Sequence, residues 1–277
     1  MKEIGSTVGL LLSVALLTVG CGGHETVASP DSLSEQPTTV RIGVTSTETH
    51  HWDHVRQTLL QENIIVELVE FTDWVTPNTS LVFGDIDLNH FQNHTFLANF
   101  NQQNNENLVA IGETTFMPLG IHSLRHTRLD QVTTGFTVAI ANDPTNGARG
   151  LRLLETAGLI QLDPDADQLV FVSDVIYNPF SLNFVELEAQ QLPIALPDVD
   201  FAVINAIIAW EAGLNPHQEA VFIEPVTADS TAFNVALVAT GERANEPALQ
   251  AVVRHFQTDE VARIILEIFD GTHVPVW

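Results

Sequence analysis

The amino-acid sequence predicts an α/β protein, and the order of its apolar segments supports that prediction, while its length allows two domains. Short apolar runs that suit buried strands alternate along the chain with longer segments of helical character. Strands that alternate with helices favour parallel pairing, because each crossover passes through a helix. The chain has 277 residues, which is enough for two modest domains, since single domains commonly contain about 100–150 residues.

The first residues have the pattern of an export signal. An apolar run from Val8 to Val19 follows Lys2 and ends just before Gly20 and Cys21. A membrane span needs about 20 apolar residues, so the shorter run suits the core of a signal peptide over residues 1–20. Small residues before a cysteine resemble a bacterial lipobox, in which the cysteine is diacylated and becomes the mature N-terminus. We therefore expect lipidation at Cys21, and the alternative is a secreted protein with one free thiol.

Charge and composition exclude several classes of function. The chain has 10 Lys and Arg against 35 Asp and Glu, a formal net charge of −25 at pH 7, which repels the phosphates of nucleic acids. The only lysine is Lys2, inside the predicted signal peptide, so the mature chain has no amine for Schiff-base chemistry or a phosphate-binding loop. We expect no nucleic-acid partner and no lysine-based catalysis.

After the signal peptide, the chain is expected to run through a tether into a folded body. Residues 21–38 include many Ser, Pro, Glu and Thr without apolar periodicity, which is typical of a flexible tether. The body begins near Thr39 with a strand to Val44, a helix from His50 to Asn63 and a strand from Ile64 to Val69. Further apolar runs predict strands of a buried sheet at Leu108 to Gly112, Thr137 to Ala141 and Phe201 to Ile204.

Two segments outside this alternation are candidate hinges. They run from Phe116 to Ser123 and from Ala232 to Ala239, and helices from Glu246 to Phe256 and from Asp259 to Phe269 then close the chain. If the chain leaves its first domain after the former segment and returns before the latter, a cleft lies between two domains. Domain I then covers residues 39–121 plus 229–277, and domain II covers residues 122–228. Clefts between domains are favoured sites for small molecules.

The segment from Asn142 to Arg149 has the pattern of a carboxylate receptor. Asn142 or Asp143 can cap a helix that has Pro144 in its first turn, which leaves backbone N–H groups free at the end of a strand. Arg149 adds a planar guanidinium that suits a carboxylate in bidentate geometry. The alternative is that Arg149 is a surface cation paired with Glu155.

Many ordered segments resemble the methionine-binding lipoprotein family, the substrate-binding subunits of methionine ABC importers. The resemblance runs from about Val40 to Trp277. It is carried by the stretches Phe71 to Asn78, Gly84 to Gln92, Asn142 to Asn146 with Arg149, Val185 to Ala189, Ala202 to Asn205 and Thr258 to Trp277. The resemblance implies a two-domain periplasmic-binding-protein fold, type II-like, with the ligand cleft between discontinuous domains. It also implies capture without catalysis and without a cofactor.

The same resemblance implies roles for individual residues. Arg149 and Asn146 would bind the ligand carboxylate, and the side-chain oxygens of Asn205, Asn234 and Glu188 would accept from the ligand ammonium.

The side chain of the ligand would lie against Trp74, Phe91, Asn93, Phe96 and Met117, since a thioether sulfur makes favourable contacts with aromatic rings. Family members commonly have His and Tyr where Asn93 and Phe96 stand, and Tyr at Trp74. The resemblance therefore implies an amino-acid receptor without fixing strict methionine specificity.

Two other classes of function have some support in the residues. A zinc- or manganese-binding receptor of a metal importer is suggested by His50, His51 and His54, because His50 and His54 can share one helix face. Two ligands do not complete a site, and no other metal-ligand spacing is present. An enzyme could use paired carboxylates for acid/base work, and the candidates are Asp85 with Asp87 or Glu186 with Glu188. In so acidic a chain such pairs arise by chance.

We therefore predict a monomeric binding protein, lipid-anchored at the extracytoplasmic face of the cell membrane. Its ligand would be methionine or a related small amino acid. Its expected partners are the membrane permease and the ATPase subunits of an ABC importer.

Overall fold

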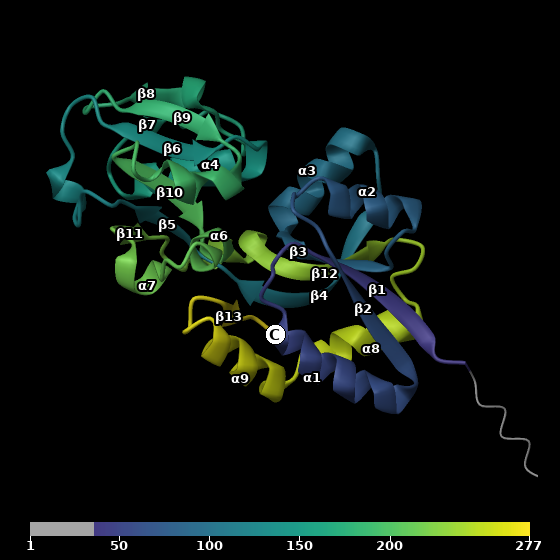
Figure 1. The fold of residues 1–277 in the computed structure, drawn as a ribbon. Helices are drawn as coiled ribbons and strands as arrows, with labels where there is room; N and C mark the ends of the chain where they lie inside the picture. Colours follow the sequence, from purple (N-terminus) through teal and green to yellow (C-terminus); the bar gives the residue numbers. More distant parts are fainter. Residues whose placement is uncertain (1–35) are drawn as a thin grey trace, which may run out of the picture. The chain divides into compact units, whose positions relative to one another are not determined.

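Two β-sheets organise the part of the chain that the computed structural model describes, residues 36–277. The larger one, sheet A, has the strand order β13-β4-β12-β3-β1-β2, and the smaller one, sheet B, has the order β11-β5-β10-β6-β9. Figure 1 shows the elements of each sheet gathered into a separate lobe. The predicted signal peptide, Cys21 and most of the tether lie outside the described residues.

Sheet A takes its strands from both ends of the described region. Its strands are β1 (Thr38–Val44), β2 (Ile64–Glu70), β3 (Leu88–Asn93), β4 (Leu108–Phe116), β12 (Asn234–Thr240) and β13 (Val274–Pro275). Helices cover both faces, with α2 and α3 on one side and α1, α8 and α9 on the other (Figure 1). These helices are α1 (His50–Leu59), α2 (Thr76–Phe83), α3 (His94–Asn104), α8 (Pro247–Phe256) and α9 (Asp259–Ile268).

Sheet B is built from the middle of the chain. Its strands are β5 (Leu119–His122), β6 (Thr137–Ala141), β9 (Asn183–Leu187), β10 (Phe201–Asn205) and β11 (Phe222–Ile223). Its helices are α4 (Pro144–Thr156), α5 (Leu192–Ala195), α6 (Ala206–Glu211) and α7 (Pro216–Glu219). The short strands β7 (Gln161–Leu162) and β8 (Val175–Tyr177) pair with each other beside it.

The short 3-10 helices fill connections in both lobes. They are η1 (Leu60–Glu62), η2 (Leu129–Gln131), η3 (Val172–Asp174), η4 (Ala189–Gln191) and η5 (Ala228–Phe233).

Each lobe has its own buried core, as the apolar runs predict. Trp52, Leu237 and Phe256 are fully buried around sheet A, and Ile140, Leu151 and Phe201 are buried around sheet B. The mixed pairing of both sheets departs from the prediction of parallel strands. Strands β1, β2 and β3 pair in parallel, but β4 pairs antiparallel with β12 and β13.

The chain crosses between the sheets at two places, and the first one corrects the predicted hinge strand. The segment from Phe116 to Ser123 is not one strand, because β4 ends at Phe116 in sheet A and β5 begins at Leu119 in sheet B. Pro118 stands in the break, where its missing N–H interrupts a sheet ladder. The chain returns between β11 and β12, and this second crossover lies within residues 224–233. The first crossover precedes the predicted boundary, because β5 belongs to sheet B although the prediction assigns residues 119–121 to domain I. The second crossover includes the predicted boundary between residues 228 and 229.

The other predicted elements occur within a few residues of their expected bounds. The strand β6 matches its prediction, and η1 ends the first predicted helix at Glu62, where Asn63 takes a left-handed conformation with φ of 58°. Strands β3 and β9 were not among the predicted strands. Both contain polar residues, which removes the continuous apolar pattern. In β3 two of them, Asn89 and Gln92, are buried and hydrogen-bond to Asn78.

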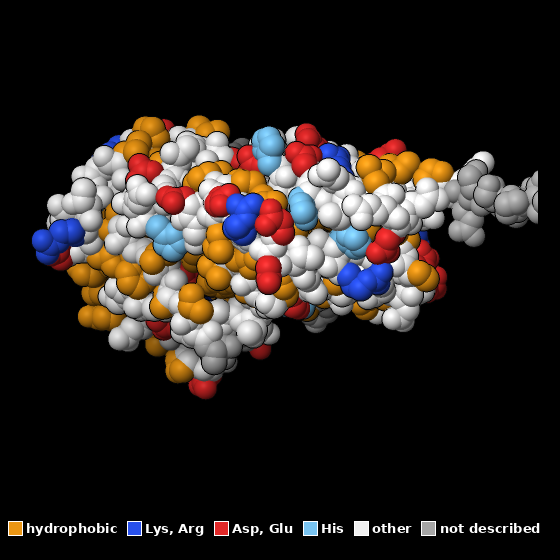
Figure 2. Space-filling view, turned by 90° about the horizontal axis from the view of Figure 1, so that it is seen from below, with side chains coloured by type: hydrophobic (Ala, Val, Ile, Leu, Met, Phe, Trp, Pro, Cys, Tyr) orange, Lys and Arg blue, Asp and Glu red, His pale blue; other side chains and the backbone are white. Residues whose placement is uncertain are grey.

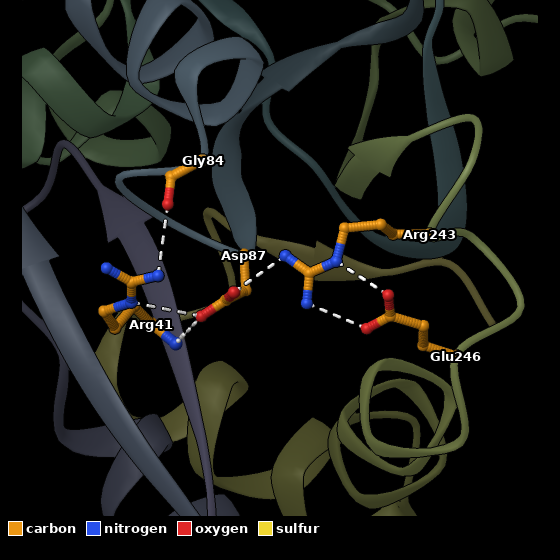
Figure 3. A network of polar contacts seen from close by, with 5 residues as sticks. All are labelled: Arg41, Gly84, Asp87, Arg243 and Glu246. Carbon is orange, nitrogen blue, oxygen red and sulfur yellow. Dashed lines mark hydrogen bonds and ion pairs between the residues drawn. The ribbon is translucent and has the colours of Figure 1, made fainter.

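A polar network joins two inner strands of sheet A to the segment before α8 (Figure 3). Asp87 accepts hydrogen bonds from the backbone N–H of Arg41 at 2.7 Å and from Nη1 of Arg243 at 2.7 Å. Arg243 also binds both carboxylate oxygens of Glu246, at the start of α8. Arg41 reaches the carbonyl of Gly84, where α2 ends with a φ of 77° that suits glycine. The network joins β1, β3 and α8.

The surface reflects the acidic composition. On the face in Figure 2, basic side chains occur as separate groups beside acidic ones. Among the described residues, none of the helices is both long enough and apolar enough to span a bilayer.

Candidate functional site

A pocket with about 450 Å³ of empty volume is lined by residues from both sheets. It brings together eight of the residues singled out from the sequence, namely Trp74, Phe91, Asn93, Phe96, Met117, Asn146, Arg149 and Asn205. Gln92, Ala206, Ile207, Phe233 and Val235 complete the lining.

Parallel pairing in sheet B explains why the polar residues meet. β6 and β10 are neighbouring parallel strands, so their carboxyl ends lie at the same edge of the sheet. Helix α4 begins just beyond β6 and helix α6 begins just beyond β10. Asn146, in the first turn of α4, therefore lies next to Asn205, the residue that precedes α6.

A chain of hydrogen bonds fixes the orientation of both asparagine amides. Nδ2 of Asn146 donates to the two carboxylate oxygens of Asp143 at 3.1 and 3.0 Å. Oδ1 of Asn146 then accepts from Nδ2 of Asn205 at 2.8 Å. Because the Asp143 carboxylate only accepts hydrogen bonds, the direction of the whole chain is set. It leaves Oδ1 of Asn205 as an acceptor at the pocket.

The helix cap itself corrects one expectation from the sequence. Asp143 is the cap and Pro144 follows it, as predicted, but the N–H groups of the first turn are not free. Oδ1 of Asp143 accepts from the N–H groups of Thr145 and Asn146, and the carbonyl of Asp143 accepts from Gly147. A well-capped helix has already satisfied its own donors. The backbone of this turn therefore offers no free donor of its own.

Arg149 is buried and already holds one carboxylate. Its Nε donates to Oε1 of Glu224 at 2.9 Å, and its Nη2 donates to Oε2 at 2.5 Å. The side chains of Arg149 and Glu224 are 4% and 13% exposed. The sequence predicts a bidentate pair between Arg149 and a ligand carboxylate. In the structure the carboxylate of Glu224 makes a bidentate pair with Arg149 instead.

The remaining edge of the guanidinium is available to a ligand. Nη2 of Arg149 also donates to the carbonyl of Met117 at 2.9 Å, and the ring of Phe233 lies 4.3 Å from the guanidinium carbon. Within residues 36–277, Nη1 donates no hydrogen bond, while Arg149 lines the pocket. Contacts with Glu224, Met117 and Phe233 hold the arginine in place, and Nη1 is the donor that remains.

Glu224 was missed by sequence reasoning, which offered Glu155 as the alternative partner of Arg149. That alternative is wrong, because Oε1 of Glu155 accepts from the backbone N–H of Leu162. Glu224 is 75 residues from Arg149 along the chain, so no local spacing connects them. The only signal in the sequence is its position, directly after the short apolar pair Phe222 and Ile223 and before the returning strand.

Aromatic side chains form the apolar side of the pocket. The rings of Phe91 and Phe96 meet edge to face, with their centroids 5.7 Å apart. Asn93 caps helix α3, because its Oδ1 accepts from the N–H of Phe96 at 2.9 Å. Trp74 also lines this side. The cap holds Asn93 and Phe96 in one fixed arrangement.

Two of the predicted ammonium ligands lie elsewhere. Asn234 is not part of the pocket lining, although its neighbours Phe233 and Val235 are. Glu188 is exposed and precedes the 3-10 helix η4, and it is also outside the lining. Of the three predicted acceptors, Asn205 alone lines the pocket.

The histidines proposed for a metal site do not converge. His50 is exposed and pairs with Glu48 at 2.7 Å, whereas His51 turns into the core. Burial lowers the pKa of His51 to about 4. In the described part of the chain, no group of three or more His, Cys, Asp or Glu side chains is placed to hold a metal ion.

Comparisons with known proteins identify the family of this chain. The family model described as NlpA lipoprotein matches residues 40–277. The D-methionine-binding lipoprotein MetQ of Escherichia coli K12 is 35% identical over 277 residues, which cover 98% of this chain and 97% of that protein.

Two solved structures are similar over most of the described region. The substrate-binding protein of a methionine transporter from Streptococcus pneumoniae has a TM-score of 0.82 and 33% identity, covering 86% of this chain and 96% of that one. A nutrient-binding protein from Burkholderia cenocepacia bound to methionine has a TM-score of 0.82 and 32% identity, covering 86% of this chain and 100% of that one. The described residues thus have the two-domain periplasmic-binding-protein fold, and the chain belongs to the NlpA lipoprotein family.

Proposed function

We propose that this chain is the substrate-binding lipoprotein of an ABC importer and that its pocket captures methionine or a close relative. The observation that carries the proposal is that one pocket contains both Nη1 of Arg149 and Oδ1 of Asn205. One is a charged donor and the other an acceptor, which are the groups that an amino-acid carboxylate and amine require. The relatives named for methionine support the choice of ligand.

The apolar side of the pocket supports an uncharged ligand side chain. Phe91, Phe96 and Trp74 offer aromatic surface, and Arg149 is the only charged residue among those that line the pocket in the described chain. Glu224 neutralises that charge. A side-chain carboxylate such as that of glutamate would be desolvated there without a partner, at a large cost.

Binding proteins of this kind act by capture and release, without catalysis. The two crossovers, at Met117–Leu119 and within residues 224–233, are the connections about which the lobe of sheet A and the lobe of sheet B would close on the ligand. Contacts from both sheets line the pocket, so closure assembles the site.

The names of the relatives support a lipid anchor, and the sequence around Cys21 supports its position. We place the mature N-terminus at a diacylated Cys21, with the protein acting as a monomer outside the cytoplasmic membrane and delivering its ligand to a permease driven by an ATPase. Intact mass spectrometry of the membrane fraction should show loss of residues 1–20 and gain of acyl mass. A Cys21→Ala protein that stays uncleaved in the membrane would indicate a signal anchor instead.

The ligand itself can be identified directly. Mass spectrometry of small molecules released from protein purified without added ligand should show methionine or a methionine-containing compound. Calorimetric titration should then rank methionine above leucine and well above glutamate. One methylene changes binding by about 1–3 kcal/mol, so the step from methionine to leucine should be moderate. Tight binding of glutamate or a sugar, with no binding of methionine compounds, would contradict the proposal.

A further inference from the structure

Three buried amide side chains meet beside the ligand pocket, and the function proposed above gives them no role. Asn78 belongs to α2, whereas Asn89 and Gln92 belong to β3. Asn78 and Asn89 are 0% exposed, and Gln92 is 2% exposed. Gln92 lines the pocket, but Asn78 and Asn89 lie outside its lining. We call Asn78, Asn89 and Gln92 the amide cluster.

Four hydrogen bonds between side chains hold the amide cluster together. Asn78 and Gln92 exchange two of them, because Nδ2 of Asn78 donates to Oε1 of Gln92 at 2.9 Å and Nε2 of Gln92 donates to Oδ1 of Asn78 at 2.6 Å. Nε2 of Gln92 also donates to Oδ1 of Asn89 at 2.9 Å. Nδ2 of Asn89 donates to Oδ1 of Asn78 at 2.9 Å. All three amide oxygens therefore accept hydrogen bonds within the cluster.

Stability alone does not explain a buried set of amides. A buried amide gains little net free energy from its hydrogen bonds, since it loses hydrogen bonds to water on folding. Replacing both partners of a hydrogen bond with apolar groups of the same shape can be neutral or stabilising. A fully satisfied polar network adds a single, rigid arrangement of its parts. The amide cluster is therefore better explained by the elements that it positions.

Asn78 is one of the residues that attach α2 to the sheet A lobe. Of the eight residues of α2, Pro77, Asn78 and Leu81 are buried. Apolar contact has no direction, so Pro77 and Leu81 hold the helix on the core but allow it to slide or rotate. Hydrogen bonds have direction, and Asn78 forms them with β3. They set the position of α2 along β3.

Trp74 depends on the start of α2 for its position. Oδ1 of Asp73 accepts from the N–H groups of Val75 and Thr76, both at 2.7 Å. Oδ2 of Asp73 accepts from Oγ1 of Thr76 at 2.7 Å. These bonds form a tight turn that connects Trp74 to Thr76, the first residue of α2. A displacement of α2 would therefore displace Trp74.

Trp74 lies where the two lobes meet at the aromatic side of the pocket. It comes from the sheet A lobe, lines the pocket and packs against an apolar core of the sheet B lobe. Phe91 lines the same pocket and is the neighbour of Gln92 on β3. The amide cluster sets the spacing of these two walls, because Asn78 fixes α2 and Gln92 belongs to the strand that holds Phe91.

We propose that Asn78 is a positioning residue for ligand selectivity. Its hydrogen bonds with Gln92 and Asn89 hold α2 in register with β3. That register keeps Trp74 at the spacing from Phe91 that fits the side chain of the ligand. Asn78 acts without touching the ligand, since it is fully buried and outside the pocket lining. This inference rests on the proposed function and identifies residues behind the pocket that determine its fit.

Calorimetric titration of an Asn78→Leu protein with methionine and with leucine tests the proposal. A displaced Trp74 should lower the ratio of the methionine affinity to the leucine affinity about fivefold or more, because that ratio depends on the shape of the pocket. A residue that only stabilises the fold would weaken both ligands by the same factor. An unchanged ratio in a folded Asn78→Leu protein would overturn the proposal.

Asn178→Leu is the matched control. Asn178 also makes a reciprocal pair of hydrogen bonds, because its Nδ2 donates to the carbonyl of Leu182 and its Oδ1 accepts from the N–H of Leu182. It lies between β8 and β9, outside the pocket lining. Asn178→Leu should lower the free energy of unfolding and keep the affinity ratio. An equal loss of the ratio in both variants would attribute the effect to instability and overturn the proposal.

A double-mutant cycle tests the route through Trp74. Trp74→Ala removes the indole, so adding Asn78→Leu in that background should change the affinity ratio less than about twofold. If the two substitutions act independently, their effects on the ratio multiply. Multiplied effects would show that Asn78 does not act through Trp74, contrary to the proposal.

Asn89→Leu is the second variant if Asn78→Leu does not fold. It removes two of the four hydrogen bonds and leaves the reciprocal pair of Asn78 and Gln92. The affinity ratio should fall about twofold or more, and an unchanged ratio would overturn the proposal. If the wild-type protein binds methionine and the variants keep its ratio, only this inference fails. If the wild-type protein binds neither amino acid, the proposed function fails, and this inference fails with it.

Discussion

Glu224 and Arg149 form a buried ion pair that links the ligand pocket to both crossovers between the sheets. Glu224 lies on the second crossover, and its Oε2 also accepts from the N–H of Leu119 on the first, at 2.9 Å. Arg149 reaches the same first crossover through the carbonyl of Met117. A carboxylate that binds Arg149 would therefore be connected through hydrogen bonds of Arg149 and Glu224 to the segments about which the lobes would close. The pair positions the arginine and connects it to the hinges.

Loss of Glu224 should destabilise the protein before any ligand is added. Glu224→Ala leaves Arg149 buried without its partner, and breaking such pairs from one side costs about 3–5 kcal/mol. Urea unfolding should show that loss in the free energy of unfolding. The control is Glu267→Ala, which breaks a surface pair with Arg263 and should change little. Equal effects of the two substitutions would show that the pair does not support the fold.

Asn146 should act through Asn205 and not through direct ligand contact. Its amide fixes which atom of Asn205 faces the pocket, so Asn146→Ala should weaken ligand binding about 2- to 10-fold, the value of one hydrogen bond. Asn205→Leu removes the acceptor itself and should cost more. Calorimetric titration of both variants checks the order. If Asn146→Ala is the more harmful change, Asn146 contacts the ligand directly.

The sequence predicted the components of this site better than their connections. Local rules identify the cap at Asp143, the strand ends at β6 and β10, and the presence of Arg149, because each depends on neighbours in the chain. The partner of Arg149 depends on a contact across 75 residues, which no periodicity encodes. Likewise, the resemblance implied that Asn234 binds the ligand ammonium, whereas the pocket lining includes its neighbours Phe233 and Val235 but not Asn234.

The hinge strand shows the same limit at the level of the fold. Phe116 to Ser123 has the composition of one strand, and only Pro118 marks the point where the chain changes sheets. The meeting of His51, His90 and His273 along one cavity could not be predicted either. They are far apart in the sequence and come together only after sheet A has formed. The eleven histidines suggested metal binding, but no group of three or more His, Cys, Asp or Glu side chains in the described residues is placed to hold a metal ion.

Asp87 should be the most sensitive position of the network in Figure 3. Burial raises the pKa of Asp87, but hydrogen bonds from the Arg41 N–H and from Arg243 outweigh burial and hold the pKa below its ordinary value. Asp87→Ala leaves Arg41 and Arg243 without the carboxylate that they share. Glu246→Ala removes only a more exposed carboxylate that binds Arg243. Asp87→Ala should therefore lower the urea midpoint more. The reverse order would place the main support at Glu246.

The buried histidines should make stability depend on pH. Burial lowers the folded-state pKa of His51 to about 4, and those of His90 and His273 to about 3, from an ordinary value of 6.5. Between these values the unfolded chain binds more protons than the folded one, so stability is full above about pH 6.5 and falls as the pH drops toward 4. His50 has a raised pKa and the opposite sign, but it is exposed.

Urea unfolding at pH values from about 7.5 down to about 5 measures this effect, because carboxylates with ordinary pKa values near 4 contribute little in that window. His273→Phe should reduce the slope of stability against pH. A flat profile from pH 7.5 to 5 in the wild-type protein would mean that the three rings are not neutral in the core.

The central claim is that Nη1 of Arg149 binds the carboxylate of a methionine-type ligand, and calorimetric titration of Arg149 variants tests it most directly. Losing one partner of a desolvated charge pair costs about 2–5 kcal/mol, so Arg149→Ala should weaken binding roughly 30-fold to several thousand-fold. Arg149→Lys should not restore full affinity, because an ammonium cannot hold Glu224 and the ligand in the same plane. Arg152→Ala is the control, since Arg152 is exposed on α4 and donates to the carbonyls of Asp167 and Gln168. Strong loss for Arg149→Ala with normal binding by Arg152→Ala is the predicted result. Wild-type affinity for a methionine compound in a folded Arg149→Ala protein would contradict the account.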